Sequence, residues 1–280
     1  MNNSATDEKD YPLLDSLSQV IIFADELLEY IAEKGNYTET EVVVFALCRQ
    51  LIEQVDGVFI GIDQGNLSLS RSSLRNAYET QLGLNYIWKD PAKSIQRALS
   101  YKVGAMKEEI SWFNIAIADN ILEPDVPRSE LITKKTIIEN ALNVATLLPI
   151  SNEWNRAKQN LLSRQRNDDP RWYSLFRGPS SIYQLAKLLG QEDSYRLIYG
   201  GLCTTTHGTD ALKNVALEEP SRKVLILPLR DEDRIQEETP IRLGRAFLLE
   251  MIGQLISNYA HEKTNEFGLL LDDSISHTAT

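Results

Sequence analysis

Apolar residues recur every three to four positions along most of this chain, which is the spacing of amphipathic α-helices. Between residues 13 and 33 they fall on one helical face, and Gly35 follows where a helix C-terminus favours glycine. A second helix is predicted from Thr38, which pairs with Glu41 in a capping box, to about Ile62. The pattern of polar and apolar positions therefore favours helices from the start of the chain.

The same spacing predicts further helices over residues 71–90, 92–119, 129–148, 152–166, 181–189, 195–207 and 239–263. The run at 224–229 (VLILPL) is the one stretch typical of a strand. Pro228 is unfavourable in a central strand, and no second clear strand is available to pair with it. We therefore predict an extended segment lying on the helices at 224–229. The predicted fold class is all-α, a bundle of about eight to ten helices.

The domain organisation follows from the ends of this pattern. Residues 12–271 are predicted to form a single helical domain, with a sub-boundary near 123–128, where two prolines interrupt the helical spacing. Residues 1–11 and 272–280 are polar, and we expect both to be disordered.

Composition and charge narrow the classes of partner. Of the 280 residues, 42% are apolar and 25% charged, which is typical of a globular protein, and the net charge is −11. An acidic chain repels a phosphate backbone, so RNA is disfavoured as the main partner. The first residues do not resemble a signal peptide, and no apolar run reaches the ~18 residues of a membrane helix. We expect a cytoplasmic protein with no membrane partner and with both cysteines reduced.

The helix predicted at 71–90 carries the first candidate site. Arg75 and Glu79 lie four residues apart and so share one face. The helix is apolar nearly all round, which indicates burial, and buried charges need polar partners. We predict that His207 is one of these partners. The pair itself is either a structural ion pair or part of a catalytic site, and the sequence leaves both open.

The helix that precedes His207 (YRLIYGGLCTTTHG) carries the second candidate site. Gly200 and Gly201 are unfavourable inside a helix and are typical of a close approach by another element or a ligand. Either a helix packs there and His207 is a satisfied polar group, or His207 is a general base or an RNA-contacting group while Arg75 stabilises an anion. Candidate binding residues on or beside the same face are Arg196, Tyr199, Cys203 and Thr204.

A third group, Trp172, Tyr173 and Phe176, lies in an irregular aromatic stretch. These rings are expected to be core beneath a loop, with a binding platform as the alternative. The sequence contains no Walker-type phosphate loop, no GxGxxG and no HExxH. We predict neither a metal site nor a cofactor.

The residues of the first two sites also carry a family resemblance. Arg75 to Glu79 (RNAYE), with Tyr86 and the exit at Lys89-Asp90-Pro91, resembles the polar helix of a bacterial all-helical family, domain of unknown function 5677. Trp172, the stretch at 182–190 (IYQLAKLLG), Tyr195, Tyr199 and His207 are similar to the later part of its pattern. The resemblance spans roughly residues 40–260 and implies an all-helical fold, but it implies no activity. The chain departs from the family at Cys203, where a small hydroxyl residue is expected.

Three functions are consistent with these observations. The first is a binding module for a protein partner or a small ligand, within a bacterial stress or phage-defence system. The second is a metal-independent ribonuclease analogous to HEPN-type enzymes, in which His207 acts with Arg75 or Arg196, although the R-x(4–6)-H spacing of those enzymes is absent. The third is a structural protein that forms homo-oligomers through an exposed apolar patch. Whether the protein is an enzyme therefore stays open.

Overall fold

The computed structural model describes residues 12–118, 127–166, 168–202, 212, 215–228, 230 and 238–276. Its first elements are α1 (Pro12–Glu33), α2 (Glu39–Asp63), α3 (Leu67–Trp88), α4 (Pro91–Ala118), α5 (Arg128–Ala141) and α6 (Leu148–Ser163). Next come the 3₁₀ helix η1 (Trp172–Arg177), α7 (Ile182–Leu188), the short α8 (Glu192–Ser194) and the π-helix η2 (Tyr195–Tyr199). The last elements are α10 (Glu238–Tyr259), the 3₁₀ helix η5 (His261–Lys263) and α11 (Thr264–Ser276). Nine helices of at least seven residues occur in this part of the chain, which confirms the all-α prediction.

The predicted helix boundaries are set by local hydrogen bonds. Gly35 has a φ of 70°, the left-handed conformation of a helix C-terminal glycine. The backbone N–H of Thr38 donates to Glu41 Oε2 at 2.7 Å, and the N–H of Glu41 donates to Thr38 Oγ1 at 3.3 Å. This capping box is the one predicted. Ser181 likewise caps α7, since its Oγ accepts from the N–H of Gln184 at 3.2 Å.

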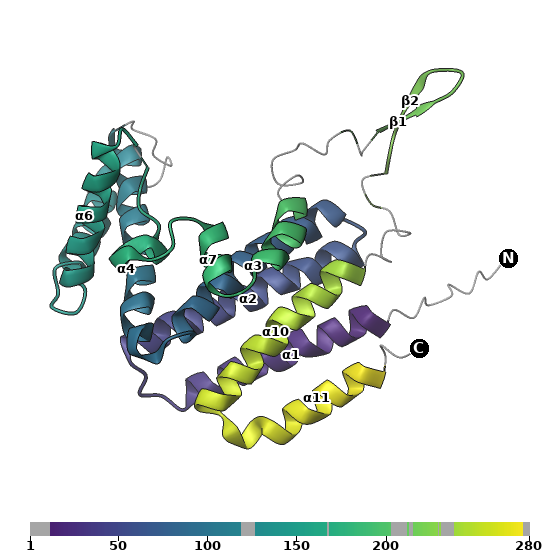
Figure 1. The fold of residues 1–280 in the computed structure, drawn as a ribbon, viewed down its shortest axis with the longest axis horizontal. Coiled ribbons are helices and arrows are strands. Elements are labelled where there is room, and N and C mark those ends of the chain that lie inside the picture. Colours follow the sequence, from purple (N-terminus) through teal and green to yellow (C-terminus); the bar gives the residue numbers. More distant parts are fainter. Residues whose placement is uncertain are drawn as a thin grey trace. The chain divides into compact units, whose positions relative to one another are not determined.

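Cα packing divides the chain into two compact units. Unit 1 comprises Met1–Asn36, Phe45–Gln81 and Asp193–Thr280, and unit 2 comprises Tyr37–Val44 and Leu82–Glu192. In unit 1, α1 packs along α10 and also contacts α11, so that these three helices lie side by side (Figure 1). Their buried faces are the apolar faces that the sequence predicts, including Leu17, Val20 and Leu248.

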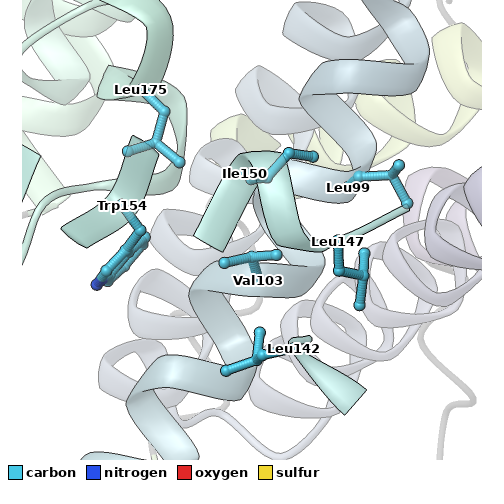
Figure 2. Packing of buried hydrophobic residues seen from close by; sticks show 7 residues of the cluster. All are labelled: Leu99, Val103, Leu142, Leu147, Ile150, Trp154 and Leu175. Atoms are coloured by element: carbon cyan, nitrogen blue, oxygen red, sulfur yellow. The ribbon is translucent and has the colours of Figure 1, made fainter. Parts of the chain in front are cut away.

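In unit 2, α4 is the helix on which the other elements pack. It contacts α5, α6 and η1, and Figure 1 shows α6 running alongside it. Figure 2 shows the core between them, in which side chains from α4, α6, η1 and the turn after α5 point toward one another. These residues are Leu99, Val103, Leu142, Leu147, Ile150, Trp154 and Leu175. The α4 framework thereby fixes the start of η1, where the candidate pocket of this unit lies.

Two details differ from the sequence predictions. The helix predicted over residues 129–148 ends at Ala141, and Pro149 lies in the first turn of the next helix, α6, where proline is favoured because that turn needs no N–H donor. Within the predicted segment 224–229, residues 224–226 are extended as part of β2 (Lys223–Ile226), which pairs antiparallel with β1 (Val215–Glu218). All residues of both strands are exposed, so these described strand residues do not pack on the helices as predicted. The partner strand, VALE, was missed because alanine and glutamate favour helices.

Candidate functional site

The structure brings three of the predicted site residues together in unit 1. Arg75 and Glu79 lie one turn apart on α3, with Arg75 Nε 3.4 Å from Glu79 Oε1. Tyr199, from η2, lies between them. Its hydroxyl accepts a hydrogen bond from Arg75 Nη2 at 2.9 Å and donates one to Glu79 Oε1 at 2.8 Å. The side chains of Arg75 and Glu79 are 16% and 35% exposed, so this network is partly buried.

Aromatic contacts fix Tyr199 in this network. Its ring stacks on that of Tyr195, with centroids 4.8 Å apart and planes 20° apart, and the guanidinium of Arg75 lies 4.9 Å from the Tyr199 centroid. Burial, together with the hydrogen bond to Glu79, raises the pKa of Tyr199 to about 12 against the opposing effect of Arg75. Tyr199 therefore stays a neutral donor at physiological pH. Because this neutral hydroxyl is hydrogen-bonded to both members of the Arg75–Glu79 ion pair, it stabilises the contact between α3 and η2.

The other predicted site residues are not all available to this network. Cys203, Thr204 and His207 lie outside the described residues, and their proximity to Arg75 stays a prediction. Arg196 is exposed on η2. A Cβ built on Gly200 or Gly201 meets no described atom within 4 Å, so no packed element in the described part of the chain accounts for these glycines.

A second site lies in unit 2, where a pocket of 640 Å³ opens between the end of α3, α4, η1 and α7. Four of its lining residues are basic, namely Lys93, Arg97, Arg177 and Lys187, and none of the lining residues is acidic. Lys93 is paired outside the pocket with Asp90, at 3.3 Å. The other lining residues include aromatic rings, amides and hydroxyls: Tyr86, Gln96, Ser100, Trp172, Phe176, Ser180 and Gln184. The pocket is therefore basic in an acidic protein.

Arg97 is the most buried of the basic residues, with an exposed fraction of 8%. Its Nη1 donates to the backbone oxygen of Tyr86, one of the last carbonyls of α3, and its guanidinium lies 4.0 Å from the Tyr86 ring centroid. Its Nε is also buried but has no hydrogen-bond partner among the described residues, and no described carboxylate pairs with Arg97. The cap on α3 thus explains the hydrogen bond of Arg97 Nη1, but it gives the guanidinium no counter-ion.

The pocket wall at η1 has an unusual backbone. Phe176 and Arg177 have φ values of 53° and 62°, in the left-handed region that side chains other than glycine rarely adopt. The backbone N–H of Phe176 donates to Glu153 Oε1 at 3.0 Å, and Arg156 binds both oxygens of the same carboxylate at 2.7 Å. The hydrogen bond from Arg156, reinforced by that from Phe176, lowers the pKa of Glu153 against the effect of burial. Glu153 is therefore ionised at neutral pH and holds the strained turn in place.

Gly178 is required for the same turn. A Cβ at this position would lie 2.0 Å from the carbonyl oxygen of Tyr173 and 2.9 Å from the Tyr86 hydroxyl. Any residue with a Cβ would clash at this position, so only glycine fits.

Sequence reasoning identified part of this pocket. The sequence favours a core position for Trp172, Tyr173 and Phe176, with a binding platform as the alternative. The structure buries Tyr173 and packs Trp172 against the core of unit 2, but Phe176 is exposed, and Trp172 and Phe176 both line the pocket. The basic residues were missed because they come from separate segments with no shared motif. The aromatic stretch at 172–177, followed by Arg-Gly-Pro, was the available signal.

Within the described ranges, no three His, Cys, Asp or Glu residues are grouped as a metal site would require. None of the helices in those ranges has the length and apolar character needed to cross a bilayer.

Comparison with known proteins places the chain in a family. The model of the "Family of unknown function (DUF5677)" matches residues 41–223, more than half of the chain, and the chain belongs to this family. This confirms the resemblance found in the sequence. Neither the curated proteins nor the solved structures contain a match.

Proposed function

We propose that this member of the DUF5677 family is a binding protein, and that its ligand is a small anion held in the pocket of unit 2. The single observation that carries the proposal is Arg97, a buried guanidinium with no carboxylate partner among the described residues and an unsatisfied Nε. It lines a pocket that has three further basic residues and no acidic one.

An anion would complete the interactions of the Arg97 guanidinium, which its contacts within the described residues leave unfinished. Burying one charge costs several kcal/mol. A charged hydrogen bond to the Tyr86 carbonyl contributes about 1.5–3 kcal/mol, and a desolvated cation–π contact about 2 kcal/mol. Together these contacts are of the same order as the desolvation cost, but they leave Nε unpaired and supply no negative charge. A bound phosphate or carboxylate would supply both the acceptor and the opposite charge.

The remaining lining residues support a small anion over a large one. Arg177 and Lys187 add positive charge from η1 and α7, so the attraction converges on the pocket. Hydroxyl and amide groups from Ser180, Gln96 and Gln184 can donate to further oxygens. Outside the pocket the chain is acidic, with a net charge of −11, which disfavours extended polyanions.

The cytoplasmic location and the setting in bacterial stress or phage defence belong to this proposal and rest on the sequence alone. Ribonuclease activity depends on His207, which lies outside the described residues. In the unit 1 network, Arg75 is held by Glu79 and Tyr199 in an arrangement suited to a structural role. We therefore rank the binding module above the enzyme and above an oligomer scaffold.

The proposal is tested by thermal unfolding with inorganic pyrophosphate, at ionic strength matched with sodium chloride. A ligand at about 100 times its Kd stabilises the folded state by about 2.7 kcal/mol, so the wild-type melting temperature is expected to rise with pyrophosphate concentration. Arg97→Gln should remove most of this rise because it deletes the buried charge.

The matched control is Arg166→Gln, which makes the same change at a 63% exposed arginine of unit 2 that does not line the pocket. It should respond to pyrophosphate like the wild type. An equal response in Arg97→Gln and the wild type, or no response in the wild type to any small anion, contradicts the proposal.

A further inference from the structure

Resting on the proposed function, we infer that the anion is the phosphate end of a nucleotide, whose base lies against Phe176 and Trp172 in the same pocket. The structure supplies three observations that a simple anion leaves unexplained. They are the size of the pocket, an exposed ring held on strained backbone, and a second ring fixed by its neighbours.

The pocket is larger than an inorganic anion requires. Its volume of 640 Å³ lies within the roughly 300–1,000 Å³ of sites that enclose ligands of drug size. Phosphate or pyrophosphate would contact the basic groups and leave much of this space to water. A mononucleotide or dinucleotide phosphate has the size to fill it.

Phe176 is the first ring. It is 38% exposed and lines the pocket, whereas the preceding residue, Leu175, is 3% exposed and packs into the core of unit 2. A phenylalanine with a φ of 53° adopts a conformation that is unfavourable for a bulky side chain. Glu153 holds that conformation through the Phe176 N–H. The strain therefore keeps an apolar ring at the pocket and out of the core, which is a placement suited to stacking on a ligand.

Trp172 is the second ring, and its position is fixed. The Tyr101 and Tyr173 rings lie edge-on to it at 5.4 and 5.6 Å between centroids. Glycines face it on two helices, since a Cβ at Gly83 would lie 3.3 Å from the indole and one at Gly104 would lie 3.0 Å from Trp172 Cβ. A ring held in this way loses little conformational entropy when a flat ligand packs against it.

The polar groups of the pocket match the rest of a nucleotide. Arg97, Arg177 and Lys187 provide the charge for phosphate oxygens. The amides of Gln96 and Gln184 carry both donors and acceptors, as recognition of a base edge or a ribose requires. Basic groups, amides and two rings in one pocket are the chemistry of nucleotide binding.

The experiment compares the affinities of ADP, pyrophosphate and ribose 5-phosphate by isothermal titration calorimetry, without added metal. Base stacking on an aromatic ring is expected to make ADP bind at least about fivefold tighter than either base-free ligand. Phe176→Ala should remove this advantage and leave the affinity for pyrophosphate unchanged. Phe176→Gly, which accepts the left-handed backbone, should behave in the same way if the turn is disturbed by alanine. Trp112→Ala, at a 57% exposed ring of α4 outside the pocket, is the aromatic control and should bind as the wild type.

The outcomes separate this inference from the proposed function. If ADP and pyrophosphate bind with equal affinity, and Phe176→Ala leaves both unchanged, the nucleotide inference is overturned and the anion pocket stands. If none of the three ligands binds, or if Arg97→Gln binds them as the wild type does, the anion pocket itself is overturned.

Discussion

Arg75 and Arg97 illustrate the difference between a residue that stabilises the fold and one that lines a binding pocket. Arg75 is paired with a carboxylate and with Tyr199, so its contacts balance its charge. Arg97 is more buried and has a carbonyl and a ring but no carboxylate among the described residues. Binding sites commonly keep such unfavourable groups at the expense of stability.

This contrast predicts how the two residues respond to replacement by methionine in the absence of ligand. Arg75→Met breaks a partly buried network and should lower the free energy of unfolding by about 2–3 kcal/mol. Arg97→Met keeps the aliphatic stem and removes an uncompensated charge, so losses and gains should nearly cancel, within about 1 kcal/mol. Urea denaturation measures both. A loss in Arg97→Met as large as that in Arg75→Met would show that Arg97 is a structural residue.

At the scale of elements, glycines decide how closely α4 and η1 approach. Gly104 on α4 faces Trp172 Cβ and the ring of Trp154, at 3.0 and 3.3 Å from its would-be Cβ. Gly200 follows η2 in helical conformation, with φ −59° and ψ −44°, and its would-be Cβ meets no described atom within 4 Å. Close packing therefore requires a glycine at position 104, whereas no described neighbour requires one at position 200.

Alanine substitution is expected to have opposite signs at these glycines. Gly104→Ala should lower the free energy of unfolding by about 1–2 kcal/mol, because overpacking outweighs the gain in helix propensity. Gly200→Ala should raise it by up to about 1 kcal/mol, since only the propensity term acts. Chemical denaturation of both variants provides the comparison. A destabilised Gly200→Ala would mean that something occupies the space beside Gly200 in solution.

The turn in η1 depends on one carboxylate, and this predicts a pH dependence. The pKa of Glu153 is lower in the folded state than its ordinary value of 4.5. Its contribution to stability is therefore complete above about pH 4.5 and is lost as the pH falls through the folded pKa. The free energy of unfolding of the wild type minus that of Glu153→Gln should be largest at neutral pH and should shrink below pH 4.5. A difference that is independent of pH would exclude this role for the charge.

The elements also show how far the sequence could be interpreted. Strong periodicity and caps such as Thr38 with Glu41 predict the helices well, because both signals are local. The helix boundary predicted at residue 148 and the absence of a second strand are both wrong, since proline suits a helix start as well as an end and VALE has the composition of a helix. The Arg75–Glu79 pair followed from its spacing. The pocket did not, because its residues come from four segments that only the packing of unit 2 brings together.

At the scale of the whole molecule, the basic pocket contrasts with a net charge of −11. A ligand that fits within the pocket meets basic groups and no acidic ones, whereas a longer nucleic acid also meets the acidic surface. An RNA-binding protein normally binds a longer RNA more tightly, because each additional phosphate that it contacts releases counterions. That gain should be absent here.

The affinity for single-stranded RNA is therefore expected not to exceed that for ADP. Competition of oligonucleotides of increasing length against ADP measures this directly, with the same molar concentration of strands. An affinity that rises steadily with length would instead favour an extended RNA surface and, with it, the ribonuclease alternative.

The central claim, that a small anion binds at the Nε of Arg97, is tested most directly by NMR of the arginine side chains. The ¹⁵Nε–¹Hε resonance of Arg97 can be assigned from its absence in Arg97→Gln and followed during a pyrophosphate titration. The account predicts a saturable downfield shift of this proton as Nε gains an acceptor, with Arg166 unchanged. Saturable binding that leaves the Arg97 resonance in place would contradict the account.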